Sequence, residues 1–386
     1  MMKILFIHNY YKKAGGEDQV VENEMALLRE QGHQVALLSF HNEALKQGIG
    51  EIRNFFFNTT AYQSVIQSIR KFQPDVIHVH NFFYQASPAV FYAAQSAAVP
   101  VVQTLHNYRL ICANALLMRD AKPCELCIKQ VFNWYGVKYK CFQGSAIKTA
   151  LLSSMIAWHH EQKTWVSRVN RFIALTDFAK QKFISSALGI PAHKITVKAN
   201  SVIDLGVLPP AKRENFLLFV GRLSTEKGIE VLLDALVLIQ LPVRIIGNGP
   251  LAQRVVERVQ QLDHVQYLGE QSHHEVLAQL GKSRGVLFPS VCYEGLPTVI
   301  LEAFSVGTPV IASAIDNINQ IVLNQVNGLT FETGNAQALA KQANLLVEEQ
   351  RWAKLAEKAR WSFEQAYTPE MNYQQLIEIY QEVIQS

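Results

Sequence analysis

Two glutamates, Glu294 and Glu302, stand eight residues apart where an apolar run gives way to a loop and then to a helical pattern. Pro297 suits the first turn of a helix, so Glu294 is expected in the loop after a strand and Glu302 about one turn into the helix. Ionised carboxylates accept bidentate hydrogen bonds and can hold the hydroxyls of a polyol. Glutamates at this spacing more often lie on the solvated surface, so the pair indicates a binding site only together with its neighbouring residues.

Two further turns in the second half suit an anionic ligand. Arg222 and Lys227 follow an apolar run at 216–221 and open a helix, where glycines allow close backbone approach and the helix N-terminus favours negative charge. These features outline a diphosphate site. A Gly-Asn-Gly turn at 247–249 follows the next apolar run, although such a turn by itself usually marks only a change of chain direction.

The first half offers glycines and histidines. Gly15 and Gly16 precede a helix, and their N–H groups could receive an oxyanion or an acceptor hydroxyl; a flexible loop capped by acidic residues is equally consistent. His106 ends the apolar run at 101–105 and is placed to reach a ligand. His78 and His80 flank a valine in another run, and we expect that they do not both face the site and are structural.

Short apolar runs of strand length alternate with segments of helical period in both halves, which is typical of parallel sheets wrapped by helices. The expected strands lie at 4–8, 35–40, 76–80, 101–105, 172–175, 216–221, 243–247, 265–268, 285–289, 309–313 and 328–331. A chain of 386 residues is long enough for two domains. The pattern predicts an α/β protein of two Rossmann-like domains, with the chemistry-bearing residues at the carboxyl ends of strands.

Tandem prolines at 209–210 mark an exposed connector and place the domain boundary near residues 200–212. The predicted domains are 1–200 and 201–368, and 369–386 is predicted to be a C-terminal helix that could pack back on the N-terminal domain. The N-terminal domain carries 22 Lys/Arg and 12 Asp/Glu, and the rest of the chain carries 14 and 20. Two solvated surfaces of different composition explain this asymmetry; alternatively, the N-terminal half faces an anionic partner.

Together these residues resemble the retaining glycosyltransferases of family 4, which have the GT-B fold of two Rossmann-like domains with parallel sheets facing across a cleft. Residues 221–228 match that family's Gly-Arg-Leu-x-x-x-Lys-Gly signature, and 294–302 match its Glu-x7-Glu signature, in the family's order. The likeness covers nearly the whole chain. Residues 314–321 depart from the family, because they lack its Gly-Gly turn followed by Glu-Ile.

The resemblance implies a role for each motif. Arg222 and Lys227 would hold the donor diphosphate, Glu302 the ribose hydroxyls and Glu294 the transferring sugar, and His106 would reach that sugar from the acceptor side. The catalytic residues would then be His106, Glu294, Arg222 and Lys227. The donor-binding residues would be Gly15, Gly16, Arg222, Lys227, Gly247, Asn248, Gly249, Leu268, Glu294, Gly295, Leu296, Pro297, Thr298 and Glu302.

The implied reaction moves a sugar from a UDP- or GDP-sugar to a saccharide or lipid-linked acceptor in cell-surface polysaccharide or glycolipid biosynthesis, with retention of anomeric configuration. Positive charge preorganised at the leaving diphosphate is the catalyst that such a reaction needs. The sequence has no Asp-x-Asp, so no catalytic metal is expected. A nucleotide-sugar 2-epimerase of related fold and a non-catalytic nucleotide-sugar binder are the alternatives, and no nucleic-acid partner is expected.

Four of the five cysteines, Cys112, Cys124, Cys127 and Cys141, fall within 30 residues and include one Cys-x2-Cys. Four thiolates could close a tetrahedral structural zinc site. Reduced, partly buried thiols are equally consistent with the spacing. Disulfides are less expected in a reducing compartment.

The compartment and the surface charge give two further expectations. The first apolar run is too short for a signal peptide or a membrane span, and no later run reaches about 18 apolar residues, so we expect a cytoplasmic protein. Residues 129–171 interleave basic and aromatic side chains, which suits peripheral contact with an anionic membrane at its cytoplasmic face. A place in the protein core is slightly favoured for the apolar residues of the same stretch.

Overall fold

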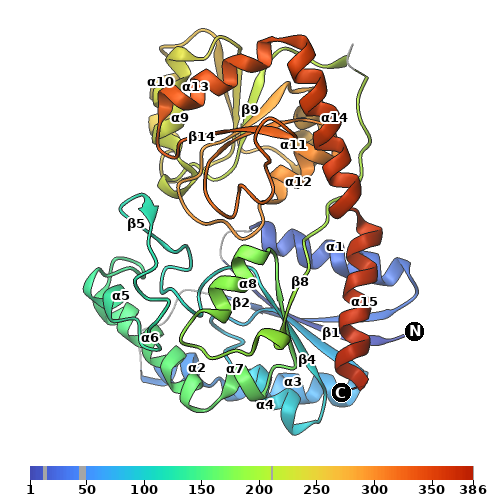
Figure 1. The fold of residues 1–386 in the computed structure, drawn as a ribbon. Coiled ribbons are helices and arrows are strands. Elements are labelled where there is room, and N and C mark those ends of the chain that lie inside the picture. The colour runs from blue at the N-terminus through green and yellow to red at the C-terminus, as the bar shows by residue number, and fades with distance from the viewer. Residues whose placement is uncertain (12–14, 43–48, 210–211, 386) are drawn as a thin grey trace. The chain divides into compact units, whose positions relative to one another are not determined.

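The computed structural model describes residues 1–11, 15–42, 49–209 and 212–385, and they form two compact units. Unit 1 comprises Met1–Leu116, Glu125–Asn200 and Glu370–Ser386, and unit 2 comprises Leu117–Cys124 and Ser201–Pro369. Each unit contains one six-stranded parallel sheet with helices packed against it (Figure 1). The expected class, two Rossmann-like domains, is confirmed.

The sheet of unit 1 has the strand order β2-β1-β3-β4-β7-β8. Its strands are β1 (Lys3–Tyr10), β2 (Gln34–His41), β3 (Val76–Asn81), β4 (Val101–Leu105), β7 (Arg171–Ala174) and β8 (Ile195–Val197). β3 and β4 are buried along their whole length, as is usual where both faces of a parallel sheet are covered. β8 is not among the strands expected from the sequence, because three residues are too few to form a recognisable apolar run.

Helices from both ends of the chain cover one face of this sheet. The helices of unit 1 are α1 (Gly16–Glu30), α2 (Ile49–Phe56), α3 (Thr59–Phe72), α4 (Ala89–Ser96), α5 (Trp134–Lys138), α6 (Ala146–Glu161), α7 (Thr164–Ser167), α8 (Asp177–Ile184) and α15 (Pro369–Gln385). Leu28 of α1, Phe6 of β1 and Leu376 of α15 belong to one buried cluster. The last helix of the chain therefore completes the core of the first unit.

Unit 2 repeats the architecture with the strand order β11-β10-β9-β12-β13-β14. Its strands are β9 (Leu217–Val220), β10 (Val243–Ile246), β11 (Val265–Gly269), β12 (Gly285–Phe288), β13 (Val310–Ser313) and β14 (Gly328–Phe331). Its helices are α9 (Ile229–Ala235), α10 (Ala252–Val259), α11 (His273–Lys282), α12 (Thr298–Ser305), α13 (Ala336–Asn344) and α14 (Glu349–Ala366). All six strands agree with expected apolar runs, so their carboxyl ends place the loops of the second half along one edge.

A short antiparallel hairpin of β5 (Met118–Arg119) and β6 (Lys122–Pro123) was not expected from the sequence. It lies in the segment Leu117–Cys124, which groups with unit 2 although its neighbours in the chain belong to unit 1. Among the helices that the structure describes, none combines the length and the apolar character needed to cross a membrane.

Candidate active site

A lysine and a glutamate meet at the carboxyl end of the sheet of unit 2. Lys227 Nζ lies 2.7 Å from Glu294 Oε1, and the Ser290 hydroxyl donates to the same oxygen at 2.8 Å. Lys227 follows β9 and Glu294 follows β12, which are neighbours in the sheet. Burial lowers the pKa of Lys227, but the Glu294 carboxylate, together with smaller effects of Cys292 and Glu226, outweighs burial, so the net pKa is raised. Lys227 is therefore a charged ammonium at neutral pH.

Close packing between loops explains two of the glycines that the sequence highlights. Gly228 and Gly247 have φ angles of +70° and +136°. A Cβ atom on Gly228 would lie 1.8 Å from the carbonyl oxygen of Pro289, and one on Gly247 would lie 1.9 Å from the carbonyl oxygen of Gly221. The loops after β9, β10 and β12 thus rest on one another, and this contact alone requires glycine, with or without a ligand.

Glu302 has a partner of its own. Its side chain, on α12, is buried, and Oε1 lies 2.9 Å from Nε2 of His273. His273 is the first residue of α11, so it reaches Glu302 from the helix that follows β11. The hydrogen bond to Glu302 raises the pKa of His273, against a smaller opposing effect of burial. Sequence reasoning missed His273, because only the fold brings α11 against α12.

The other predicted donor residues of unit 2 line the same edge. Arg222 is exposed, and its side chain forms no hydrogen bond or ion pair within the described ranges. Gly247, Asn248 and Gly249 follow β10, Leu268 lies in β11, and Gly295, Leu296 and Pro297 lead into α12 at Thr298. The Asn317 side chain donates a hydrogen bond to the carbonyl oxygen of Glu294. Asn317 falls in the stretch that departs from the family pattern, so no role was predicted for it.

The two predicted glycines of unit 1, Gly15 and Gly16, lie at the start of α1. Gly15 precedes the helix, and its N–H donates to Asp18 Oδ2 at 2.9 Å while Asp18 Oδ1 lies 2.8 Å from His8 Nε2. The Asn81 amide donates to Glu17 Oε1 at 3.2 Å. Burial, with repulsion from Asp18, raises the pKa of Glu17 to about 7. The helix start is thus occupied by its own acidic side chains.

His106 ends a buried chain of polar contacts. His106 Nε2 lies 2.9 Å from His80 Nδ1, His80 Nε2 lies 3.5 Å from Glu24 Oε2, and Lys198 Nζ lies 2.7 Å from Glu24 Oε1. Burial lowers the pKa of His106 to about 4 and that of His80 well below its ordinary value. Both rings are therefore neutral at pH 7. A cavity lined wholly by residues of unit 1 opens beside His106.

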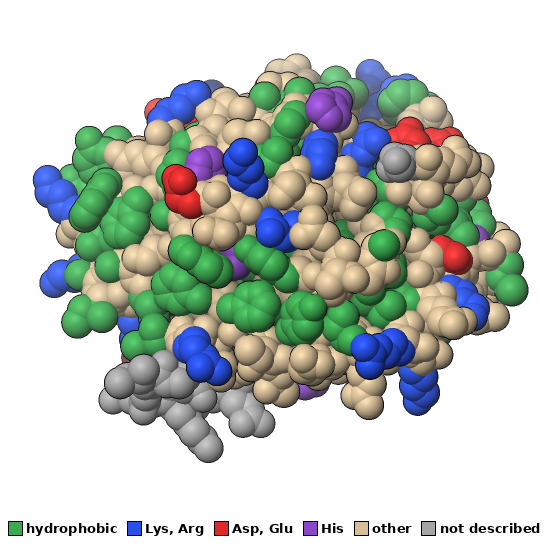
Figure 2. Space-filling view, turned by 90° about the horizontal axis from the view of Figure 1, so that it is seen from below, with side chains coloured by type: hydrophobic (Ala, Val, Ile, Leu, Met, Phe, Trp, Pro, Cys, Tyr) green, Lys and Arg blue, Asp and Glu red, His purple; other side chains and the backbone are tan. Residues whose placement is uncertain are grey.

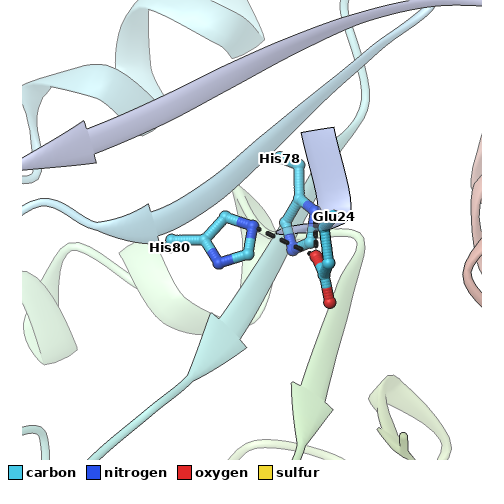
Figure 3. A group of neighbouring side chains, drawn as sticks. All are labelled: Glu24, His78 and His80. Carbon is cyan, nitrogen blue, oxygen red and sulfur yellow. Dashed lines mark ion pairs between the residues drawn. The ribbon is translucent and has the colours of Figure 1, made fainter. Parts of the chain in front are cut away.

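His78 and His80 lie on the same face of β3, with ring centroids 4.1 Å apart, and both rings point toward Glu24 (Figure 3). The expectation that they do not both face the site assumed that they point to opposite faces of the strand. That assumption is wrong, because side chains two residues apart in a strand share a face. The ring nitrogens of His78 contact the hydroxyls of Tyr380 and Thr104 at 2.7 and 2.8 Å. The structural role expected for His78 agrees with these contacts.

The three side chains drawn in Figure 3 could by spacing hold a metal ion, since their ligand atoms lie within 4.8 Å of one another. Their surroundings argue against it. The Lys198 ammonium already neutralises the carboxylate, and both ring nitrogens of His78 already have hydroxyl partners. A divalent cation placed next to that ammonium would meet strong repulsion. We interpret the group as a buried ion-pair network.

The buried neutral histidines predict that the protein loses stability on acidification. An unfolded histidine binds a proton near pH 6.5, whereas folded His106 binds one only near pH 4. Between these values the unfolded state holds more protons, so the free energy of unfolding falls as the pH falls, by up to about 1.4 kcal/mol per pH unit for each such histidine. His106→Asn should reduce this slope in urea unfolding, and exposed His193→Asn should leave it unchanged. Equal slopes in the two variants would contradict the assignment.

Two family models match consecutive parts of the chain. The model of glycosyl transferases group 1 matches residues 204–381, and that of Glycosyltransferase Family 4 matches residues 14–203. An uncharacterised glycosyltransferase of Methanocaldococcus jannaschii is 22% identical over 393 residues, which cover 99% of this chain and 99% of that protein. The O-antigen chain mannosyltransferase C of Escherichia coli is 31% identical over 181 residues, 45% of this chain and 48% of that protein.

A solved structure shows the same fold. HepE of Anabaena, in complex with UDP-glucose, superposes with a TM-score of 0.69 at 19% sequence identity, and the alignment covers 99% of this chain and 100% of that chain. The two parallel sheets, the motif-bearing loops at their carboxyl ends and the two family matches agree with one another. The chain belongs to the glycosyltransferases of family 4, which have the GT-B fold.

Proposed function

We propose that this glycosyltransferase moves a sugar from a UDP- or GDP-sugar to a saccharide or lipid-linked acceptor, with retention of anomeric configuration, in polysaccharide or glycolipid biosynthesis. The observation that carries the proposal is the charged Lys227 ammonium, held by Glu294 where two neighbouring strands of unit 2 end. The E. coli relative is named as an O-antigen mannosyltransferase, and HepE was solved with UDP-glucose. Both names agree with nucleotide-sugar chemistry.

In this proposal the donor diphosphate lies between Lys227 and Arg222. Breaking the bond between the anomeric carbon and the diphosphate leaves negative charge on the phosphate oxygens, and a fixed ammonium stabilises that charge more than it stabilises the ground state. Arg222, exposed and without a partner in the described part of the chain, can add a second positive charge. Glu302, held by His273, would accept hydrogen bonds from the ribose hydroxyls.

Neutral His106 fits the acceptor side of the reaction. A neutral imidazole has one N–H donor and one acceptor nitrogen, so it can hydrogen-bond a sugar hydroxyl without adding a charge near the positive anomeric carbon. No side chain need remove the acceptor proton, because in the front-face mechanism implied by the family the leaving phosphate takes it. Glu294, whose Oε1 bonds to Lys227 and Ser290, positions the ammonium and would contact the sugar.

Assays with and without acceptor distinguish the proposed activity from its rivals. A panel of UDP- and GDP-sugars is first screened for protection of the full chain against thermal unfolding, since a ligand that binds the folded state raises its stability. The protecting donor is then incubated with and without saccharide acceptors, and the products are analysed. Transfer requires the acceptor, whereas a 2-epimerase converts the donor alone and a binder turns over nothing.

Lys227→Ala should lower turnover at saturating donor by about 10²- to 10³-fold, as is typical when one donor to transition-state charge is removed. Lys282→Ala, which alters an exposed ion pair with Glu214 in the same unit, is the matched control and should leave turnover unchanged. Thermal unfolding of both variants checks that the fold is retained. Undiminished turnover of Lys227→Ala would place the diphosphate elsewhere.

A structural zinc site at the four clustered cysteines stays a prediction. Among them, Cys112 Sγ contacts Asn114 Oδ1 at 2.9 Å. The groups of three or more close metal ligands found in the described ranges contain histidines and carboxylates but no cysteine. Elemental analysis of the purified protein should find about one zinc per chain and less in Cys124→Ser. Chains without zinc would show that these cysteines are ordinary reduced thiols.

Peripheral membrane contact is a further proposal. Between residues 129 and 171, large apolar side chains are exposed at Trp134, Tyr135, Tyr139, Ile147 and Trp158. The face drawn in Figure 2 carries basic side chains scattered among hydrophobic ones and few acidic side chains. Interfacial aromatics with nearby cations are typical of binding to anionic lipid. The protein should float with anionic vesicles and not with neutral ones, and Trp134→Ala should weaken flotation. Equal flotation with both lipids would refute the proposal.

A further inference from the structure

The cavity of unit 1 contains polar groups that the donor chemistry does not use. It is lined by the ends of β3 and β4, by the loop that follows β4 and by two residues of α6. Gln103, His106 and Arg109 all line it. This cavity lies within one unit, so its lining does not depend on how the two units are placed.

Two of these lining side chains have buried polar atoms without a partner. Nε and Nη1 of Arg109 and Oε1 of Gln103 are shielded from solvent and have no partner within hydrogen-bond distance in the described part of the protein, although the guanidinium lies near the Tyr11 hydroxyl. Gln103 is only 4% exposed. Buried polar atoms are nearly always hydrogen-bonded, and leaving a charged group unbonded is especially costly. Unpaired donors and an unpaired acceptor in one cavity indicate a missing ligand that supplies both.

The positive charge of Arg109 is held in place but not neutralised. The guanidinium carbon lies 4.4 Å from the centre of the Phe83 ring, and the Arg109 backbone N–H donates to Asn107 Oδ1 at 3.0 Å. The described residues place no carboxylate within ion-pairing distance of it. Glu17, whose charge does act on Arg109, has a pKa raised to about 7 by burial and is only partly ionised at neutral pH.

The other acidic groups of the same region already have partners. Asp18 contacts His8 at 2.8 Å, and Glu24 contacts Lys198 at 2.7 Å. The neighbouring ring of His106 is neutral at pH 7 because burial lowers its pKa to about 4. Arg109 is therefore the cation of this cavity whose charge is left for a ligand. The ring of Phe83 keeps the guanidinium in position and compensates its charge only in part.

We propose that this cavity binds the acceptor, and that the acceptor is a saccharide bearing an anionic oxyacid group, a carboxylate or a phosphate, which accepts hydrogen bonds from the Arg109 guanidinium. A hydroxyl of the same sugar donates to Gln103 Oε1. A guanidinium recognises planar oxyanions better than an ammonium does, which explains arginine at this position. His106 lines the same cavity and so lies beside the bound sugar. The inference rests on the proposed function and adds the class of acceptor to it.

Binding to the full chain tests the inference with three sugars that differ in charge. Glucuronate supplies the carboxylate, glucose 1-phosphate supplies the phosphate, and glucose supplies neither. At least one of the two charged sugars should bind about 10-fold or more tightly than glucose in calorimetry, because a hydrogen bond to a charged group adds at least that much. The sugar that binds identifies the source of the anionic group. Glucose binding as tightly as both charged sugars, or no binding by any sugar, would overturn the proposal.

Variants assign the two contacts separately. Arg109→Gln should weaken binding of the charged sugar by about 10-fold or more and leave binding of glucose unchanged. Arg29→Gln, which alters an exposed arginine of the same unit, should change the binding of neither sugar. Gln103→Met removes a buried acceptor without changing charge, so it should keep the fold and weaken charged and neutral sugars alike. It tests the cavity even if Arg109→Gln does not fold. Unchanged binding of the charged sugar by Gln103→Met or by folded Arg109→Gln would overturn the proposal.

Binding of UDP or GDP separates this inference from the proposed function. Nucleotide protection against unfolding should be lost in Lys227→Ala and kept in Arg109→Gln, if the donor and acceptor have separate sites. Loss of nucleotide protection in Arg109→Gln would assign the cavity to the donor and overturn the inference. If UDP or GDP still protects both variants, only the proposed donor site is refuted. The effect of Arg109→Gln on charged-sugar binding would still decide the present inference.

Discussion

A charge removed from water must be paired, and this constraint organises the polar interior of both units. In unit 1 the fully buried Lys198 and Glu24 neutralise each other, and the histidines around them stay uncharged. In unit 2 Glu294 holds Lys227 in its ammonium form. Pairing fixes the position of each side chain as well as its protonation state. A group fixed in this way is preorganised, which is what stabilisation of a developing charge requires.

The constraint also gives meaning to the exceptions. Arg222 is exposed and water solvates its charge, so this side chain needs no protein partner when no ligand is bound. Two of the three guanidinium nitrogens of Arg109 are shielded from water, and a ring beneath the guanidinium is a weak substitute for a counter-ion. Two unpaired cations in different surroundings therefore call for different explanations. The charge of Arg222 is available to a ligand at the surface. The charge of Arg109 destabilises the folded protein until a ligand pairs with it.

The sequence predicted the fold well where the evidence was local. Buried strands such as β9 and β12 form short apolar runs because both faces of each strand are covered, and that pattern is visible in any window. β8 was not predicted, because its three residues are too few to show a hydrophobic periodicity. The family signatures located Lys227 and Glu294, and the structure brings these two side chains together.

Contacts between distant segments could not be predicted in this way. Glu24 looks like one more acidic residue of an amphipathic helix, and only the fold brings it to Lys198, 174 positions later in the chain. His273 and Glu302 meet through the packing of α11 and α12, and Asn317 reaches Glu294 from a stretch that departs from the family pattern. Each contact joins residues from separate elements, so no local hydrophobic periodicity or sequence motif predicts it.

The place of α15 has a consequence for the order in which the protein can fold during its synthesis. Leu376 and Tyr380 complete the core of unit 1, but a ribosome makes them only after it has made all of Ser201–Pro369. Until then the apolar side chains of β1 and α1 that pack against α15 are exposed to water, and the ring of His78 lacks its contact with the Tyr380 hydroxyl. Unit 2, whose segments are nearly continuous, can therefore close on the nascent chain before the unit that precedes it is finished.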